Sequence, residues 1–359
     1  MHNIIVRVWK GDAPTFKLFL YIPLFIISYL YRICLIIREY MYKMHLIKRE
    51  LAPIPVVSIG NITVGGTGKT PVVEKLSIIF KSEGFRPGII TRGYKRKRKG
   101  TFCVDQQNDT AEDVGDEPLM LAQKTMCPVI VGTNRSAAIA KGIKEKNIDI
   151  AVLDDGFQLR NIIKDIEILV LDGKTLKNNN DLFPLGPYRE PLKNIENADI
   201  ILMNKGEPDN RVMKLMGNKP LYKMQYKPLH LNNVKYSRMG HYNLIRGKRI
   251  LAFAGLGDNE SFFKLLRELG AHVVYEIEYP DHHAYSQKDL DSLSSYKDIS
   301  IMVTTEKDSV KFANLHLPEN LFALVIEAKI EREKDFLESI IKIIKERPCQ
   351  KESLSSTQH

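Results

Sequence analysis

A glycine-rich segment between an apolar run and a helix start constrains the fold more than any other part of the chain. The residues Gly65-Gly66-Thr67-Gly68-Lys69-Thr70 follow the apolar run 54–59 and precede Pro71, which suits a first helical turn. In such a strand–loop–helix unit, backbone N–H groups close around a phosphate. The lysine reaches terminal phosphates and the threonine hydroxyl can ligate Mg²⁺. We therefore predict a user of nucleoside triphosphates, although Thr63 stands where the common motif has a glycine.

The composition is that of a globular protein with an excess of positive charge. The 359 residues allow one large or two medium domains, and 44% are apolar and 27% charged. A formal net charge of +10 suits an acidic partner such as a nucleotide, a nucleic acid, an anionic membrane or a phosphorylated substrate. The four cysteines are widely scattered and show no metal or disulfide spacing, which favours a reducing, cytoplasmic compartment.

The N-terminal segment is unusually apolar. Residues 16–31 are almost wholly apolar or aromatic, and the apolar character resumes at 33–37 after Arg32. A spanning helix needs ~20 apolar residues, so this segment is borderline. The basic residues that follow would keep the rest of the chain in the cytoplasm. We predict a membrane-associated hydrophobic segment over 1–45, either spanning or lying in the interface; a buried amphipathic helix is the alternative.

Short apolar runs then alternate with helical patterns, which is typical of a parallel α/β domain. We assign residues 46–222 to this domain. The predicted strands are 55–59, 87–91, 129–131, 148–153, 166–171 and 199–203, and the predicted helices are 71–82, 118–124 and 135–146. Asparagine- and proline-rich sequence at 178–187 predicts a long irregular loop.

A second α/β unit follows a break in this rhythm. The polar, aromatic residues 223–235 are interpreted as an extended linker, and 236–346 as the second, smaller domain. Its predicted strands are 249–254, 271–277 and 300–304, and its predicted helices are 259–269, 287–294 and 335–345. The polar tail 347–359 is predicted to be disordered. The fold class is thus α/β: a P-loop NTPase-like parallel-sheet domain, a second α/β domain and an N-terminal hydrophobic helix.

Two pairs of adjacent carboxylates are candidates for chemistry. Asp154 and Asp155 end an apolar strand, where P-loop enzymes place a carboxylate that holds Mg²⁺; a solvated strand end is the plainer interpretation. Asp116 and Glu117 lie in a loop just before a predicted helix. They are equally well explained as acidic residues at a helix start or as a base or metal-positioning pair, and spacing alone does not decide.

Histidine and basic residues supply further candidates. Asp281 precedes His282 and His283, which is too few ligands for a tight metal site, although an Asp beside a His can hold an imidazole as a proton acceptor. Arg189, in the proline-bounded loop 183–192, could clamp a transferring phosphate or simply pair with a neighbouring acid. The segment 304–308 follows an apolar strand, at the end where α/β proteins bind ligands.

These motifs, in this order, resemble the tetraacyldisaccharide 4′-kinase family, the lipid A 4′-kinases of Gram-negative bacteria. The matching segments are SIGNITVGGTGKTP, TRGY, VGDEPLMLA, VGTNR, DDGFQLR, FPLGPYREPL, FAGLGD, YPDHHAY and VTTEKD. Each is weak alone, whereas the ordered set is highly specific, and the family's loop is similar at Thr63. One departure is Leu159, where the family commonly has a histidine.

The resemblance implies an ATP-dependent phosphotransferase of lipid A biosynthesis. It implies transfer of the γ-phosphoryl group of ATP to the 4′-hydroxyl of a tetraacyldisaccharide 1-phosphate, with ATP and Mg²⁺ as cofactors. It further implies an active site in a cleft between two α/β domains, at the cytoplasmic face of the bacterial inner membrane. The expected partners are the acylated glucosamine disaccharide and the membrane, with no nucleic acid, and we expect a monomer.

The resemblance also implies roles for individual residues. Lys69 and the loop from Gly65 to Thr70 would hold the phosphates. The expected catalytic residues are Asp116, His282 and Arg189, with Asp116 as the carboxylate base paired with His282 and Arg189 stabilising the transferred charge. The expected metal-ordering residues are Thr70, Glu117, Asp154 and Asp155.

Other classes of protein match the sequence less well. A membrane-associated ATPase of the partitioning and cell-division type has a similar loop, but its signature first lysine is Val64 here. A GTPase would read guanine with Asn-Lys-x-Asp, and Asn204-Lys205 is followed by Glu207 at the fourth position. A nucleic-acid binder is suggested by net charge alone, since the basic run 95–99 lacks interleaved aromatic residues.

Overall fold

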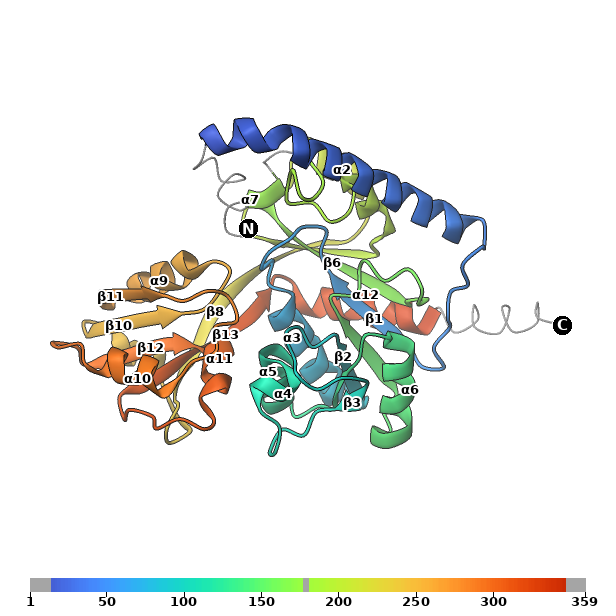
Figure 1. Cartoon of the computed structure of the whole chain (residues 1–359). Coiled ribbons are helices and arrows are strands. Elements are labelled where there is room, and N and C mark those ends of the chain that lie inside the picture. Colours follow the sequence, from blue (N-terminus) through green and yellow to red (C-terminus); the bar gives the residue numbers. More distant parts are fainter. Residues whose placement is uncertain (1–13, 177–180, 347–359) are drawn as a thin grey trace. The chain divides into compact units, whose positions relative to one another are not determined.

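The computed structural model of the chain describes residues 14–176 and 181–346 (Figure 1). The predicted disordered tail 347–359, the start of the N-terminal segment and residues 178–180 of the predicted loop lie outside the described residues. The chain forms two compact units. The first contains Met1–Lys69, Ile150–Gln225 and Ile330–His359, and the second contains Thr70–Asp149 and Tyr226–Lys329.

The first unit is built on parallel strands. β1 (Val56–Gly60) lies between β5 (Ile150–Asp154) and β6 (Ile166–Asp172), and β6 also pairs with β7 (Ile200–Asn204). β7 pairs in turn with the start of β8 (Leu221–Asn233). Nearly every residue of β1, β5, β6 and β7 is buried, as expected for parallel strands covered on both faces. Ile59 lies opposite Asp154, so the loops after β1 and β5 leave the sheet at the same edge.

Helices complete the first unit. They are α2 (Pro14–Lys43), α7 (Gly173–Leu176), η1 (Leu192–Asn197), α8 (Asn210–Met216) and α12 (Glu333–Glu346). A hydrophobic core joins Leu35 of α2, Ile62 and Phe157 with the apolar side chains of β6 and β7. α12 is fixed to β8 by Phe336, whose ring packs edge-on against Tyr222 at a centroid distance of 5.2 Å.

The end of β1 leaves room only for glycine. A Cβ at Gly60 would lie 2.4 Å from the Cβ and 2.6 Å from the backbone N of Phe157, which is fully buried. Because backbone cannot yield as a flexible side chain can, we expect Gly60→Ala to destabilise the fold by about 1–3 kcal/mol. A thermal melt measures this. Gly66→Ala is the control, since its Cβ would meet nothing within 4 Å; equal melting temperatures for the two variants would contradict the prediction.

The second unit contains two sets of strands. In the first set, β2 (Pro87–Thr91) runs parallel to β4 (Val129–Val131), and β3 (Phe102–Cys103) is antiparallel to β4. The accompanying helices are α3 (Lys69–Ser82), which begins at the boundary of the first unit, α4 (Ala111–Val114), α5 (Asp116–Thr125) and α6 (Arg135–Lys146).

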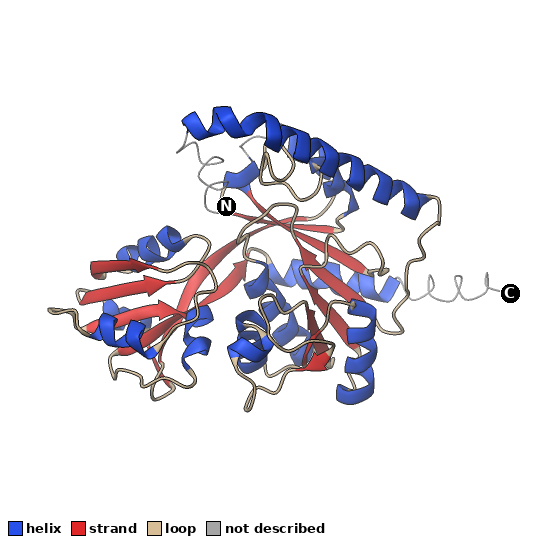
Figure 2. Ribbon diagram, viewed as in Figure 1, coloured by secondary structure: helices blue, strands red, loops and turns tan. Residues whose placement is uncertain are grey.

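The second set is a sheet covered on both faces. Its strands lie in the order β11 (His272–Glu278), β10 (Arg249–Ala254), β12 (Ile301–Thr305), β13 (Leu321–Ile330) and β8, with β9 (Arg238–Gly240) antiparallel to β8. Along β10, alternate side chains enter two cores: Ile250 packs with the residues of α9 (Asn259–Glu268), and Leu251 with those of α10 (Gln287–Ser294). Figure 2 shows these two helices on opposite sides of the strands. The short elements η2 (Tyr242–Ile245), α11 (Glu306–Ser309) and η3 (Val310–Phe312) complete the unit.

The predicted α/β class is confirmed, and most predicted elements are found within one or two residues of their expected bounds. The strand 87–91 and the helices 135–146 and 287–294 have the expected bounds. The segment 223–235, expected as an extended linker, lies mostly within the 13-residue strand β8. The elements that were not predicted include β3, β9, β13, α8 and the four-residue helices α4, α7 and α11. Asp116 and Glu117, expected in a loop before a helix, form the first turn of α5 instead.

Candidate active site

The glycine-rich loop is held in shape by two buried asparagines. The side-chain amide of Asn61, directly after β1, donates to the hydroxyl of Thr67 and to the carbonyl of Thr63, each at 2.9 Å. The side-chain amide of Asn204, the last residue of β7, donates to the carbonyl of Thr67 at 3.3 Å. Gly68 has φ +85°, which favours glycine. The loop is therefore shaped by the ends of two strands of the first unit.

The same loop has space and polarity for a phosphate. A Cβ placed on Gly65 or Gly66 would meet nothing within 4 Å, so both glycines border open space. α3 begins at Lys69, and the N-terminal end of a helix offers unpaired N–H groups and a positive potential. Thr70 occupies the first turn of α3, next to Lys69. These residues fit the triphosphate of a nucleotide, as the sequence predicts.

Lys69 and Arg189 converge on one carboxylate. The Lys69 amine lies 3.2 Å from Asp155 Oδ1, and the Arg189 guanidinium lies 3.0 Å from Asp155 Oδ2. Burial raises the pKa of Asp155, but the two cations outweigh it and hold this pKa below its ordinary value. Asp155 also has a left-handed backbone, φ 56°. Two cations facing one carboxylate leave an excess positive charge, which suits a phosphate.

The backbone of the Arg189 segment is bound to residues 62–64, which lead directly into the glycine-rich loop. Val64 N–H donates to the Pro187 carbonyl at 2.7 Å, and Arg189 N–H donates to the Ile62 carbonyl at 2.8 Å. Backbone hydrogen bonds therefore fix the position of Arg189 beside the start of the glycine-rich loop, independently of its side chain.

Two of the carboxylates expected to order Mg²⁺ are adjacent at the end of β5. Asp154 is buried at the end of β5, and Asp155 follows it directly. Among the described residues, no group of three or more His, Cys, Asp or Glu side chains is placed to hold a metal. Mg²⁺ is usually bound by one or two carboxylates together with substrate phosphates and water.

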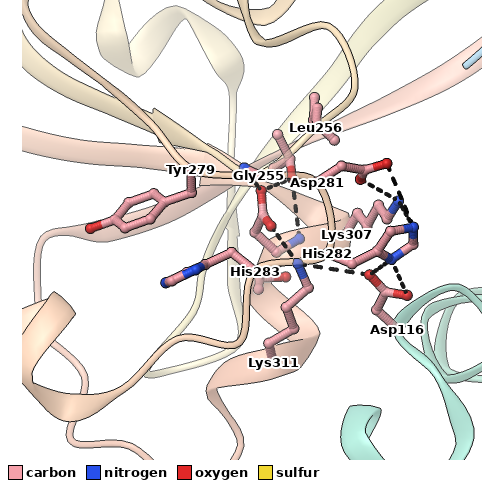
Figure 3. A network of polar contacts seen from close by, with 12 residues as sticks. Asp116, Gly255, Leu256, Tyr279, Asp281, His282, His283, Lys307 and Lys311 are labelled. Atoms are coloured by element: carbon pink, nitrogen blue, oxygen red, sulfur yellow. Dashed lines mark hydrogen bonds and ion pairs between the residues drawn. The ribbon is translucent and has the colours of Figure 1, made fainter. Parts of the chain in front are cut away.

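In the second unit, Asp116 and His282 form a close pair (Figure 3). Nδ1 of His282 lies 2.8 Å and 3.0 Å from the two carboxylate oxygens of Asp116, and Asp116 is only 4% exposed. His282 has a left-handed backbone, φ 60°, and its ring points at Asp116 on α5. The Tyr94 ring packs against the imidazole at a centroid distance of 5.1 Å. The structure thus brings together two predicted catalytic residues that lie 166 positions apart in the chain.

Two lysines of the 304–311 region, neither of which was among the predicted site residues, complete this group. Lys307 Nζ lies 3.0 Å from Glu117 Oε1, 3.2 Å from Asp281 Oδ1 and 3.4 Å from His282 Nε2. Burial lowers the pKa of Lys307, but the three surrounding carboxylates outweigh it and raise this pKa above its ordinary value. Because an ionised carboxylate only accepts, Nδ1–H of His282 is the donor in the hydrogen bond to Asp116.

The second lysine, Lys311, is oriented by a buried acid. Its amine lies 2.7 Å from Asp308 Oδ1 and 3.7 Å from Asp116 Oδ2. Asp308 is fully buried and also accepts from Gly255 N–H at 2.9 Å. Burial raises the pKa of Asp116, but the hydrogen bond from His282 and the charges of Lys307 and Lys311 outweigh it, so its pKa lies below the ordinary value. Asp116 is therefore an ionised carboxylate able to accept a proton or a hydrogen bond.

A buried charge cluster joins α3 to the same region. The Lys124 amine lies 3.0 Å from Glu74 Oε2 on α3 and 2.6 Å from Glu306 Oε2 on α11. It also donates to the Ile326 carbonyl at 3.0 Å. The helix that begins at the phosphate loop is thereby linked to the helix that carries Lys307.

This cluster predicts an unusual dependence of stability on pH. Burial raises the pKa of Glu74 from 4.5 to about 7, with Lys124 opposing the shift. An acid whose folded pKa is raised binds its proton more tightly in the folded state, so its contribution to stability is present below pH ~4.5 and is lost as pH rises towards 7. Wild type should therefore lose free energy of unfolding as the pH rises, and Glu74→Gln should not. We expect the free energy of unfolding of Glu74→Gln, relative to wild type, to rise by on the order of 2–3 kcal/mol between pH 5 and pH 8. Urea midpoints at the two pH values measure this; Glu83→Gln, at an exposed position, is the control. A parallel pH dependence of Glu74→Gln and wild type would contradict the prediction.

Comparisons with known proteins identify relatives of this chain in one family. The family described as tetraacyldisaccharide-1-P 4′-kinase (LpxK) matches residues 20–345. The tetraacyldisaccharide 4′-kinase of Syntrophus aciditrophicus is 32% identical over 373 residues, covering 95% of this chain and 98% of the relative. The tetraacyldisaccharide 4′-kinase of Bartonella tribocorum is 36% identical over 307 residues, covering 83% of this chain and 85% of the relative.

A solved structure is also similar over nearly its full length. The crystal structure of LpxK from Aquifex aeolicus in complex with ATP has a TM-score of 0.75 and 34% identity, covering 89% of this chain and 97% of that chain. By sequence and by fold, this chain belongs to the tetraacyldisaccharide 4′-kinase family.

Proposed function

We propose that the chain is an ATP-dependent tetraacyldisaccharide 4′-kinase, which transfers the γ-phosphoryl group of ATP to the 4′-hydroxyl of a tetraacyldisaccharide 1-phosphate in lipid A biosynthesis. Family membership supports the substrate class. The observation that carries the chemistry is the buried pair of Asp116 and His282, with 2.8 Å between Oδ2 and Nδ1. A sugar hydroxyl is a poor nucleophile at neutral pH, and an ionised carboxylate is the group that can accept its proton.

The remaining roles follow from charge. Lys69 and the N–H groups of the glycine-rich loop bind the ATP phosphates, and Arg189 stabilises charge on the transferring group. Thr70, Glu117, Asp154 and Asp155 would hold Mg²⁺, which would neutralise charge on the phosphates. Asp116 accepts the proton of the sugar hydroxyl, and Nδ1–H of His282 orients the carboxylate. The lowered pKa of Asp116 makes it a weak base, which suits phosphoryl transfer because the reaction depends more on alignment and charge than on early proton removal.

We further propose that α2 seats the enzyme on the cytoplasmic face of the bacterial inner membrane. Within the described residues, 21–43 is long and apolar enough to cross a membrane by length and composition. One face of this helix is buried against the first unit, whereas Phe25, Ile26, Ile33 and Ile36 are exposed apolar side chains. A helix bound along one face and apolar on the other suits a position in the interface, where a lipid substrate is within reach of a monomeric enzyme.

The test is a reaction of the purified chain with ATP, Mg²⁺ and detergent-solubilised tetraacyldisaccharide 1-phosphate. The expected product is heavier by one phosphate group, with the new phosphate at the 4′-position in a phosphorus NMR spectrum. ATP hydrolysis without lipid phosphorylation, stimulated by DNA or a protein partner, would instead support a partitioning-type ATPase.

A further inference from the structure

The inner face of α2 is a stripe of side chains that faces the first unit. Leu24, Ser28, Tyr31, Leu35 and Arg38 recur at spacings of three and four, which places them on one side of a helix. Leu24, Ser28 and Leu35 are each no more than 8% exposed. The stripe covers about four helical turns, so α2 is bound to the unit along much of its length (Figure 1).

The polar members of this stripe all bind one segment, residues 182–190. The Ser28 hydroxyl donates to the Leu182 carbonyl at 2.8 Å, and the Tyr31 hydroxyl donates to the Arg189 carbonyl at 2.9 Å. The Arg38 guanidinium donates to Glu190 Oε1 at 2.7 Å. Because hydrogen bonds are directional, these three contacts fix the position of α2 along the segment 182–190 more closely than apolar contacts alone would.

Glu190 makes the contact with Arg38 necessary. Its side chain is fully buried, and its second oxygen accepts from the side-chain amide of Asn194 at 2.7 Å. A buried carboxylate without a cation is strongly destabilising. Burial and the charge of Glu190 also raise the pKa of Tyr31, so its hydroxyl remains a donor to Arg189.

The same segment also binds residues 62–64, which lead into the glycine-rich loop. Arg189 N–H donates to the Ile62 carbonyl, and Val64 N–H donates to the Pro187 carbonyl. The Arg189 side chain reaches Asp155, which also contacts Lys69. A continuous set of hydrogen bonds therefore runs from α2 through 182–190 to the residues that would hold ATP.

We propose that α2 positions Arg189 for phosphoryl transfer, with Tyr31 and Arg38 as positioning residues, so that the helix seated on the lipid surface also sets the catalytic segment. This rests on the proposed function, because it takes Arg189 as the group that stabilises the transferring phosphoryl. In this arrangement the membrane-facing helix affects turnover as well as location.

The first arm of the test does not need catalysis. Hydrogen–deuterium exchange is measured on the full chain in detergent, for peptides that cover 182–190 and 61–64. Tyr31→Phe is expected to exchange about 2- to 10-fold faster in both peptides, because one anchoring hydrogen bond is lost. The matched control is Tyr29→Phe, which removes the same hydroxyl from a side chain that is 57% exposed on the same helix. Equal exchange in Tyr31→Phe, Tyr29→Phe and wild type would overturn the proposal.

The second arm separates positioning from membrane binding. With detergent-solubilised lipid at saturation, Tyr31→Phe is expected to lower kcat about 3- to 10-fold while the KM for ATP changes less than twofold and binding to lipid vesicles stays at the wild-type level. Arg38→Gln should lower kcat further than Tyr31→Phe does. The double variant Arg38→Gln with Glu190→Gln should recover part of this kcat, since the buried charge is removed with its partner. An unchanged kcat in Tyr31→Phe, or lost vesicle binding that accounts for the whole effect, would overturn the positioning role. If the wild-type chain fails to phosphorylate the lipid, the proposed function fails, and the exchange arm still decides whether α2 holds the segment.

Discussion

Replacing Asp116 with asparagine is expected to lower kcat by about 10²- to 10⁴-fold, the usual contribution of a positioned general base. The substitution keeps the shape of the side chain and removes the charge that accepts the proton. We propose that ATP binds through Lys69 and the glycine-rich loop, so its affinity should change by less than about threefold. Lipid phosphorylation measured by mass spectrometry and binding of a fluorescent ATP analogue give the two quantities separately.

The adjacent histidines provide a matched control for the same site. His282→Gln removes the ring that lies 2.8 Å from Asp116 and should also reduce kcat, whereas His283, which lies 3.5 Å from Asp289 instead, should tolerate the same change. Equal turnover in His282→Gln and His283→Gln would remove His282 from the mechanism. An Asp116→Asn variant with wild-type turnover would remove Asp116 as well.

Asp116→Asn should also change how the free energy of unfolding depends on pH in the acid range. The pKa of Asp116 is lowered in the folded state, so its contribution to stability is present above the ordinary pKa of ~4 and is lost as pH falls through the lower folded value. Asp116→Asn should therefore be less stable than wild type at pH 7. Its free energy of unfolding should also decrease less than that of wild type on acidification.

The parts of the site that depend on local sequence could be predicted from it. The glycine-rich loop needs glycines, Gly-Lys-Thr and a following helix within a few residues, and all of these are visible in the chain. Asp116 and Glu117 were ambiguous, because acidic residues at a helix start are stabilising without any catalytic role. The pairing of Asp116 with His282 came from the family resemblance, since no local pattern links residues 166 positions apart.

Contacts made by tertiary packing could not be predicted. Lys307 and Lys311 lie in short helical segments after β12, where lysines are usually solvated, and only the fold shows that their amines meet Asp281 and Asp308. In the sequence, Tyr31 ends the apolar and aromatic run 16–31 and Arg38 is one of the basic residues that follow the hydrophobic segment, but both side chains bind the segment 182–190. Leu159 stands where the family commonly has a histidine. The neighbouring Gln158 donates to the Asn61 carbonyl at 2.6 Å, which ties this segment to the residues that lead into the glycine-rich loop.

Lys69→Ala is expected to reduce kcat/KM for ATP by at least about 10²- to 10³-fold, the usual cost of removing one preorganised charge from a transferring group. Lys69 is the cation that begins α3, and the ion pair of its amine with Asp155, at 3.2 Å, holds it at the loop. Without it, Asp155 retains Arg189 as a cationic partner, at 3.0 Å. That ion pair would hold Arg189 against the carboxylate more strongly and add to the loss of turnover.

The matched control lies on the same helix. Lys81, in the last turn of α3, donates to the Met126 carbonyl at 3.3 Å, and Lys81→Ala removes an equal charge and stem far from the loop. Its kcat/KM should stay within about twofold of wild type, as expected for a surface lysine. A similar decrease in both variants would mean that the overall positive charge, and not the amine of Lys69, attracts ATP; increasing the salt concentration would then lower wild-type activity to the same degree, because such long-range attraction is screened. A loss confined to Lys69→Ala and insensitive to salt assigns the effect to direct contact with the phosphates.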